Sequence, residues 1–489
     1  MKSKRFTLFT GMGMSIILIL LLLFSCSKIP KNEMLITTQS KEALKLFLDG
    51  RDKFDNLEFQ QAYDLLSKAT ELDSNFALAY VYQALNADNF NEGLRAINNA
   101  TKMAVNASES EKLFIGFFKA NFDGDGVKQK ELIEQLLTMY PEDKRILLWA
   151  GNQKYNTNNF QKAKEYFEKA LLLDENFSPV YNMLGYTYAA LEENVKAEET
   201  FKKYISLIPD KSNPYDSYAE FLLKLRKYDE SIQQYRKALE VDPSFILAYN
   251  GIGNNYIFMG EFDLARNSYQ QRFDKAPQIG DKLGSLYFQA LSYIHQGDIN
   301  AALAKFNERR ELAQKENQIT TVIASHLIDA NVLAESGKPA EGLKSVQTAM
   351  ELLKNAQLED WVKENLTVAL MQLNCYCKIQ NKKFDAAKTD MDKYKQLVEK
   401  RQDPLEIMQL EGTLGCLALK EKQYDNALQH FAKSNNQSPL TWYQMALAYE
   451  QKGDTENARK LFQKISTWTT NDLDLALVRN SAINKLKSI

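Results

Sequence analysis

Side chains that could perform catalysis or bind a metal are few and widely separated. The 489 residues include three histidines, His295, His326 and His430. A catalytic or metal site needs several titratable or ligating groups that converge on one point, and these histidines fall in different parts of the chain. The spacing patterns of zinc proteases, P-loop nucleotide-binding proteins and serine hydrolases do not occur. The sequence therefore predicts a protein that is not an enzyme and that holds no metal and no cofactor.

One segment, Gly251-Ile252-Gly253, resembles half of a dinucleotide-binding motif. It lacks the third glycine, and it falls inside an expected helix rather than after a strand, where such a motif binds phosphate. We therefore interpret Gly253 as a small residue required where two helices pack together.

The three cysteines outside the amino-terminal segment show no metal-ligand spacing. Cys375 and Cys377 are two positions apart on an expected helix, so they point to different sides. We interpret these two and Cys416 as small buried hydrophobic residues. The alternative is a disulfide from Cys416 to Cys375 or Cys377, since an exported chain would meet an oxidising compartment.

The amino terminus has the pattern of an export signal. Three basic residues precede an apolar stretch that is densest over 16–24. Leu23-Phe24-Ser25-Cys26 then resembles the lipobox, the cleavage motif of bacterial lipoproteins, although Phe24 is larger than the usual residue. Polar sequence follows Cys26 directly. The alternative is an uncleaved membrane helix with an incidental cysteine.

This resemblance implies how the protein is processed and located. It implies a signal peptide over 1–25, cleavage before Cys26 and lipidation of Cys26, with an acylated cysteine and linker over 26–42. Several acyl chains hold a protein durably on a membrane. Residue 27 is Ser rather than Asp, which by the same resemblance favours the outer membrane, on its periplasmic or surface face.

The rest of the chain repeats every 34 residues. A small residue is followed four positions later by an aromatic residue in four successive units: Ala163 and Phe167, Ala197 and Phe201, Ser231 and Tyr235, Ala265 and Tyr269. The period and its aromatic pattern resemble the tetratricopeptide repeat (TPR), a pair of antiparallel helices. With only 20 glycines and 10 prolines, long helices are favoured over a strand-rich fold.

The resemblance implies an all-α fold, an α-solenoid of about eleven helical hairpins over 43–465 with a C-terminal capping helix over 466–489. We expect Gly185 and Gly253 at helix crossings, with large aromatic residues beside them. Four glycines follow expected first helices, where a left-handed cap is often needed: Gly260, Gly297, Gly337 and Gly453.

The resemblance also implies that the first helix of each hairpin lines a concave face. The positions of this helix that face a ligand form the candidate binding groove: Asn152, Asn182, Tyr186, Asp216, Glu220, Asn250 and Asn254. Asparagine both donates and accepts hydrogen bonds, so it can bind an extended backbone of any sequence. The alternative is that these are ordinary solvated residues. The basic clamp with which some relatives grip a terminal carboxylate is not evident, because Asp216 and Glu220 place acids there.

The charge is near neutral. The net charge is −2, and without residues 1–25 it is −5, from 58 bases against 63 acids. This favours no nucleic-acid partner. We therefore expect a membrane-anchored TPR scaffold that binds a protein or peptide partner on its concave face. The alternative is a carbohydrate-binding outer-membrane lipoprotein of a nutrient-uptake system, but the four tryptophans are scattered and no long insertion interrupts the repeats.

Overall fold

The computed structural model describes residues 33–87, 90–435 and 437–488. Over these ranges the chain forms α-helices and one short 3-10 helix, with no strand. The first helices are α1 (Lys41–Asp55), α2 (Phe59–Leu72), α3 (Ala77–Leu85), α4 (Phe90–Met103), α5 (Glu109–Phe122), α6 (Gly126–Met139), α7 (Lys144–Asn156) and α8 (Phe160–Leu173). The middle helices are α9 (Ser178–Ala190), α10 (Asn194–Leu207), α11 (Asn213–Lys224), α12 (Tyr228–Val241), α13 (Ile246–Met259), α14 (Phe262–Lys275), α15 (Ile279–Gln296) and α16 (Ile299–Lys315). The last are α17 (Ile319–Glu335), α18 (Pro339–Asn355), α19 (Asp360–Gln380), α20 (Phe384–Arg401), α21 (Pro404–Lys420), α22 (Tyr424–Phe431), α23 (Pro439–Gln451), α24 (Thr455–Thr467) and α25 (Leu473–Ser488).

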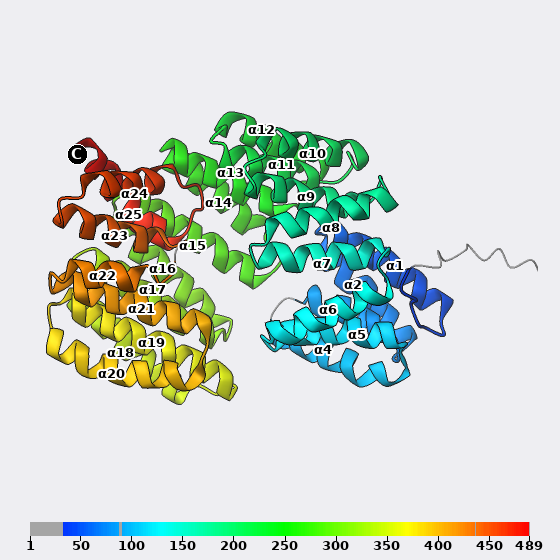
Figure 1. Ribbon diagram of the computed structural model, residues 1–489, viewed down its shortest axis with the longest axis horizontal. Helices are drawn as coiled ribbons and strands as arrows, with labels where there is room; N and C mark the ends of the chain where they lie inside the picture. The colour runs from blue at the N-terminus through cyan, green and yellow to red at the C-terminus, as the bar shows by residue number, and fades with distance from the viewer. Residues whose placement is uncertain (1–32, 88–89, 436, 489) are drawn as a thin grey trace, which may run out of the picture.

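The helices pair in chain order. In the described part of the chain, α1 to α24 form twelve hairpins, against the eleven or so expected, and α25 follows them. Each hairpin also packs on the next, so the array is an α-solenoid, as the sequence predicts (Figure 1). The solenoid curves strongly, and the ring of Phe90 on α4 lies 5.0 Å from that of Trp361 on α19.

The expected helix crossings are confirmed. An added Cβ on Gly185 would lie 2.7 Å from the ring of Phe201, and one on Gly253 would lie 2.3 Å from that of Tyr269. Phe201 and Tyr269 are fully buried. A larger residue at either glycine would therefore force the two helices of its hairpin apart.

The expected caps are confirmed as well. Gly260, Gly297, Gly337 and Gly453 have φ of 83°, 91°, 82° and 79°, a region that glycine enters without a steric penalty. The corresponding turn of other hairpins uses a residue with a side chain, such as Arg226 at φ 61°.

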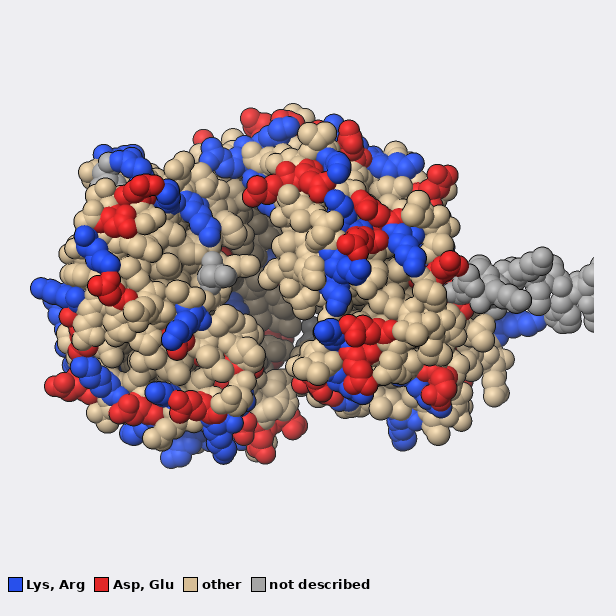
Figure 2. Space-filling view, in the orientation of Figure 1, with Lys and Arg blue, Asp and Glu red and all other residues tan. Residues whose placement is uncertain are grey.

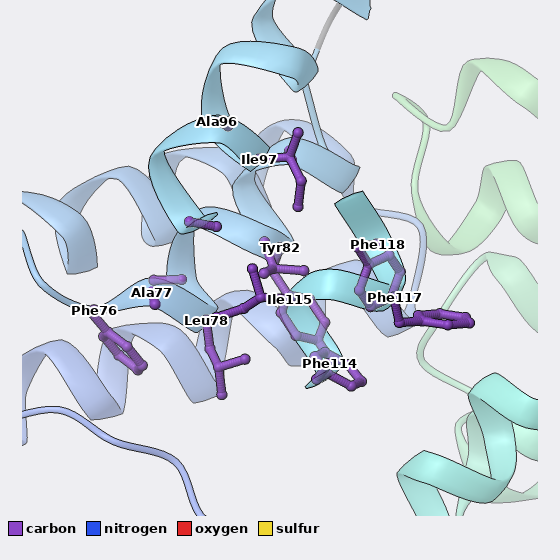
Figure 3. Close-up of a cluster of buried hydrophobic side chains, with 14 of the residues drawn as sticks. Phe76, Ala77, Leu78, Tyr82, Ala96, Ile97, Phe114, Ile115, Phe117 and Phe118 are labelled. Atoms are coloured by element: carbon purple, nitrogen blue, oxygen red, sulfur yellow. The ribbon is translucent and has the colours of Figure 1, made fainter. Parts of the chain in front are cut away.

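Aromatic side chains fill the core of the amino-terminal hairpins. Figure 3 shows Phe76 at the start of α3, Tyr82 on α3 and Phe114 on α5 among the buried side chains of this cluster. The rings of Phe114 and Phe118 pack edge to face at 5.0 Å, an arrangement that aromatic pairs favour. The hairpin α5–α6 therefore joins a continuous core although its repeat pattern is weak.

The segment before α1 is bound to the array. The backbone N–H of Met34 donates to Asp143 (2.7 Å), that of Thr37 to Glu111 (2.7 Å) and that of Gln39 to Asp73 (3.1 Å). Each carboxylate comes from a different hairpin. Part of the expected linker is thus held by the first four hairpins.

The carboxy terminus packs back on the middle of the array. Helix α25 contacts α23 and α24, as expected of a cap, and also α15. In the stretch before it, Asn471 lies 3.0 Å from Nε2 of His295 and donates to Asn254 (2.9 Å) and to the hydroxyl of Tyr269 (3.1 Å). The curvature of the solenoid brings the last hairpin beside α13 to α15, so the terminal segment covers two surfaces.

The three described cysteines are free and buried. Burial raises the pKa of each thiol to about 12. The interpretation of Cys375, Cys377 and Cys416 as small buried residues agrees with this, and the alternative disulfide is wrong because all three thiols are free.

The predicted signal peptide over 1–25 and the predicted lipidation site Cys26 lie outside the described residues. Among the helices that are described, none combines the length and the apolar character needed to cross a membrane.

Candidate partner-binding groove

Four consecutive first helices, α7, α9, α11 and α13, carry the candidate groove residues in two rows with the 34-residue spacing. One row is Asn182, Asp216 and Asn250, and the other is Asn152, Tyr186, Glu220 and Asn254. Neighbouring first helices in this series contact one another. Because the spacing equals the repeat length, each row presents equivalent positions of successive hairpins.

Part of these rows lines a cleft of about 610 Å³. The predicted residues that reach it are Asp216, Glu220, Asn250 and Asn254. Asn152, Asn182 and Tyr186 lie on the preceding hairpins and do not line it. Figure 2 shows a deep hollow near the centre of the molecule, between the C-terminal hairpins and α7 to α9. Lys, Arg, Asp and Glu are interspersed over this face.

An acidic pair lies at the centre of the groove. Asp216 and Glu220 are one helical turn apart on α11, and the hydroxyl of Tyr186 on α9 donates to Glu220. Burial raises the pKa of Glu220, and burial together with the charge of Glu220 raises the pKa of Asp216 well above its usual range. The Glu220 side chain is open to solvent, but protein surrounds it on most sides because it lies in the groove.

Three of the asparagines have unused acceptors. Within the described part of the chain, the side-chain oxygens of Asn152, Asn182 and Asn250 are buried and have no hydrogen-bond partner, while the residues themselves are half-buried. A buried polar atom without a partner is destabilising. Because protein covers these oxygens, a ligand that supplies donors, such as a polypeptide backbone, can reach them only when the amide rotates toward the groove.

Asn254 has another role. Its side-chain oxygen accepts hydrogen bonds from the hydroxyl of Tyr269 (2.8 Å) and from the amide of Asn471 (2.9 Å). It joins the groove to the chain's own C-terminal segment. The 34-residue pattern contains no signal for this contact, because Asn471 is distant in sequence.

The sequence did not indicate the other walls of the cleft. One wall is the segment Thr467 to Asn471, in which the ring of Trp468 packs edge to face on Trp442 at 5.0 Å. Another is Tyr235, whose ring would lie only 2.0 Å from a Cβ added to Gly251. Gly251 and Gly253 are thus both packing glycines. The repeat pattern identified Tyr235 as a space-filling aromatic residue but not as part of the cleft.

The histidines do not converge. His295 is buried beside Asn471, and Nδ1 of His430 lies 2.7 Å from Glu411 on α21. Within the described ranges, no group of three His, Cys, Asp or Glu side chains is placed to hold a metal ion.

Family models match several parts of the chain. A tetratricopeptide repeat model matches residues 145–177, 178–211 and 440–472, and a second TPR repeat model matches 222–260. A cohesin loading factor model matches 284–412. The chain therefore contains tetratricopeptide repeats. This fold is typically a non-enzymatic scaffold suited to binding proteins.

Curated relatives share this repeat region at low identity. Hsp70-Hsp90 organizing protein 3 of Arabidopsis thaliana is 30% identical over 44% of this chain and 38% of its own length. Hsp70-Hsp90 organizing protein 2 of the same plant is 22% identical over 41% and 35%. A TPR repeat-containing protein of Methanocaldococcus jannaschii is 26% identical over 53% and 48%. The matches thus span between a third and a half of the relatives' own length.

Two solved structures are similar to parts of this chain. Yeast Tom70 matches 87% of this chain and 96% of its own, with 16% identity and a TM-score of 0.41. A tetratricopeptide repeat protein of Parabacteroides merdae matches 54% of this chain and 98% of its own, with 16% identity and a TM-score of 0.37.

Proposed function

We propose that this protein is a membrane-anchored scaffold that binds an extended polypeptide in the groove of α7, α9, α11 and α13. The observation that carries the proposal is the recurrence of half-buried amides, Asn152, Asn182 and Asn250, on the first helices of three hairpins, with side-chain oxygens that have no partner among the described residues. With its amide rotated so that the oxygen faces the groove, each can accept one backbone N–H of a bound chain, and their placement on three hairpins suits an extended ligand.

The cleft supports the same proposal. Its volume of about 610 Å³ lies within the range of about 300–1,000 Å³ that is usual for ligand sites. Apolar side chains, Leu247, Phe288 and Trp468, share its walls with the polar ones. An apolar wall with a few placed polar groups is the usual composition of a binding site.

The anchor is the second part of the proposal. Lipidation at Cys26 would attach the chain to a membrane, for which we propose the outer membrane. Because Met34 is bound to Asp143, only the residues between Cys26 and Met34 connect the array to the anchor. Fully extended, they span about 30 Å at most. The array would therefore work close to the membrane surface.

Replacing Asn182 and Asn250 together by Ala is expected to weaken peptide binding about tenfold, because each lost hydrogen bond contributes about 0.5–1.5 kcal/mol. The melting temperature should not fall, since these oxygens have no partner among the residues that the structure describes. Purified protein would be offered a peptide library and, separately, an oligosaccharide library. The affinity of selected peptides would then be measured for both forms by calorimetry.

The matched control is Lys202→Ala with Lys237→Ala, two exposed residues on the second helices α10 and α12. This pair should leave both affinity and melting temperature unchanged. If peptides bind the Asn182→Ala, Asn250→Ala variant as tightly as the unaltered protein, the partner binds outside this groove. Binding of oligosaccharides alone would favour the carbohydrate-uptake alternative.

Cys26→Ser is expected to abolish lipidation and to leave a longer, unprocessed precursor, because the thiol is the acceptor in the lipoprotein pathway. Mass spectrometry of the membrane fraction checks both points. Ser27→Ala is the control and should be processed normally. A lipid-modified mature chain from the Cys26→Ser form would contradict the anchor.

A further inference from the structure

The acidic pair of the groove lacks a cation. Asp216 is only 6% exposed and lines the cleft. Among the residues that the structure describes, none forms an ion pair with Asp216 or Glu220, and the Asp216 carboxylate has no hydrogen-bond donor. Glu220 receives a single hydrogen bond, from Tyr186. Two neighbouring carboxylates, the buried one of Asp216 and the solvent-open one of Glu220, thus line the cleft with few partners among the described residues.

Such an arrangement is costly without a ligand. Burying a carboxylate removes its hydration, and here no hydrogen bond or ion pair within the described chain replaces it. A second carboxylate one turn away adds repulsion. The cation nearest in sequence, Lys224, does not relieve this. Lys224 lines the cleft, but its ammonium donates to the carbonyl of Ala189 (2.8 Å). A cation from outside the chain would relieve the repulsion and use the free acceptors.

We propose that the cleft takes a basic side chain of the bound polypeptide, an arginine or a lysine, between Asp216, Glu220 and Asn250. This inference rests on the proposed function and names the chemistry of the partner at one position. A guanidinium offers five N–H donors in a planar fork, and the two carboxylates that line the cleft offer matching acceptors, to which Asn250 adds one when its amide rotates toward the cleft. The aliphatic stem of the same side chain would pack on Phe288 and Trp468, which line the cleft.

Three peptide libraries test this inference. Each has the same randomised flanks, and the central residue is fixed as Arg, norleucine or Glu. We expect the full-length protein to retain the Arg library at least tenfold more strongly than the norleucine library, and the Glu library least. Asp216→Asn with Glu220→Gln, which preserves the side-chain shapes, should reduce the affinity for Arg peptides to that for norleucine peptides.

Glu199→Gln is the matched control, because Glu199 is exposed on α10 and does not line the cleft. It makes the same kind of charge change and should keep the preference for Arg. The melting temperature of each form shows whether it is folded, and Asp216→Asn alone serves if the double form is unstable.

The outcomes separate this inference from the proposed function. Peptides that bind equally well with Arg, norleucine or Glu overturn the inference and leave the function standing. An Arg preference that persists in Asp216→Asn with Glu220→Gln also overturns the inference. If no library binds, the proposed function fails and the inference with it. Free arginine amide that binds as tightly as the Arg peptides would show a small-molecule site and would likewise overturn it.

The affinity for Arg peptides should also rise with pH. Burial raises the pKa of both carboxyl groups, and a bound cation requires their ionised forms, so binding releases protons. The titratable and charged groups that face the pair are Tyr155 on α7, Tyr186 on α9, Lys224 on α11 and Tyr235 on α12. The wall from Thr467 to Asn471 carries no charge. Affinity that falls with rising pH would contradict the ionised pair as the site.

Discussion

Phe201→Ala is expected to lower the free energy of unfolding by about 3–5 kcal/mol, the usual cost of removing a large aromatic side chain from a packed core. Phe201 is fully buried and fills the space that Gly185 leaves open. Its ring also packs against Tyr186 at 5.2 Å and Phe221 at 5.5 Å. The substitution therefore removes contacts within one hairpin and between two.

Hydrogen exchange would show where the damage lies. Because hairpins of a solenoid contact mainly their neighbours, exchange should rise over about 144–245 and change little over 384–431. Leu172→Ala is the control, since Leu172 is 87% exposed, and it should cost less than about 0.5 kcal/mol. A uniform loss of protection along the whole chain would contradict a solenoid built from neighbour contacts.

His295 makes the contact between the carboxy terminus and the middle of the array sensitive to acid. Burial lowers the pKa of His295 from 6.5 to about 4, so the folded protein holds the ring neutral over a range in which the unfolded chain protonates it. Between about pH 6.5 and 4 the unfolded state binds the additional proton. The contribution of His295 to the free energy of unfolding is therefore complete above pH 6.5, and about 3 kcal/mol of it is lost as the pH falls to 4.

The comparison of the original protein with His295→Gln isolates this effect. Gln keeps a polar group beside Asn471 and does not titrate. Denaturant unfolding from pH 7 to pH 4 should show the original protein losing about 3 kcal/mol relative to the His295→Gln form. Other groups, such as Asp472 with its pKa raised to about 6 by burial, titrate in both forms and cancel. Parallel stability curves would contradict a buried neutral His295.

The hairpins could be predicted because the relevant contacts are local and recur. Gly185 with Phe201 and Gly253 with Tyr269 are pairs 16 residues apart in sequence, both within one hairpin. The same steric requirement appears in every typical unit, so its residues reappear at the 34-residue spacing. The left-handed turns at Gly260 and Gly297 are equally local, since a positive φ is a property of one residue.

The composition of the groove could be predicted only in part. The rows that contain Asn182 and Asp216 follow from the repeat, which decides the helix face on which a residue lies. Whether a residue on that face has a partner depends on what packs opposite it. Asn250 keeps a free acceptor, whereas Asn254, four positions later, is bonded to Asn471.

Residue types and spacing alone thus determined the helical hairpins, their turns and the face that carries the groove, because these depend on neighbours within one repeat length. Only the tertiary structure decided that the C-terminal segment forms a wall of the cleft, that Met34 is bound to Asp143, and that no cation of the described residues pairs with Asp216 or Glu220. The contacts of Met34 with Asp143 and of Asn471 with Asn254 join residues 109 and 217 positions apart, and they arise from small rotations between hairpins that add up along the solenoid. No local sequence pattern predicts the accumulated rotation, so the cleft could be found only in the folded chain.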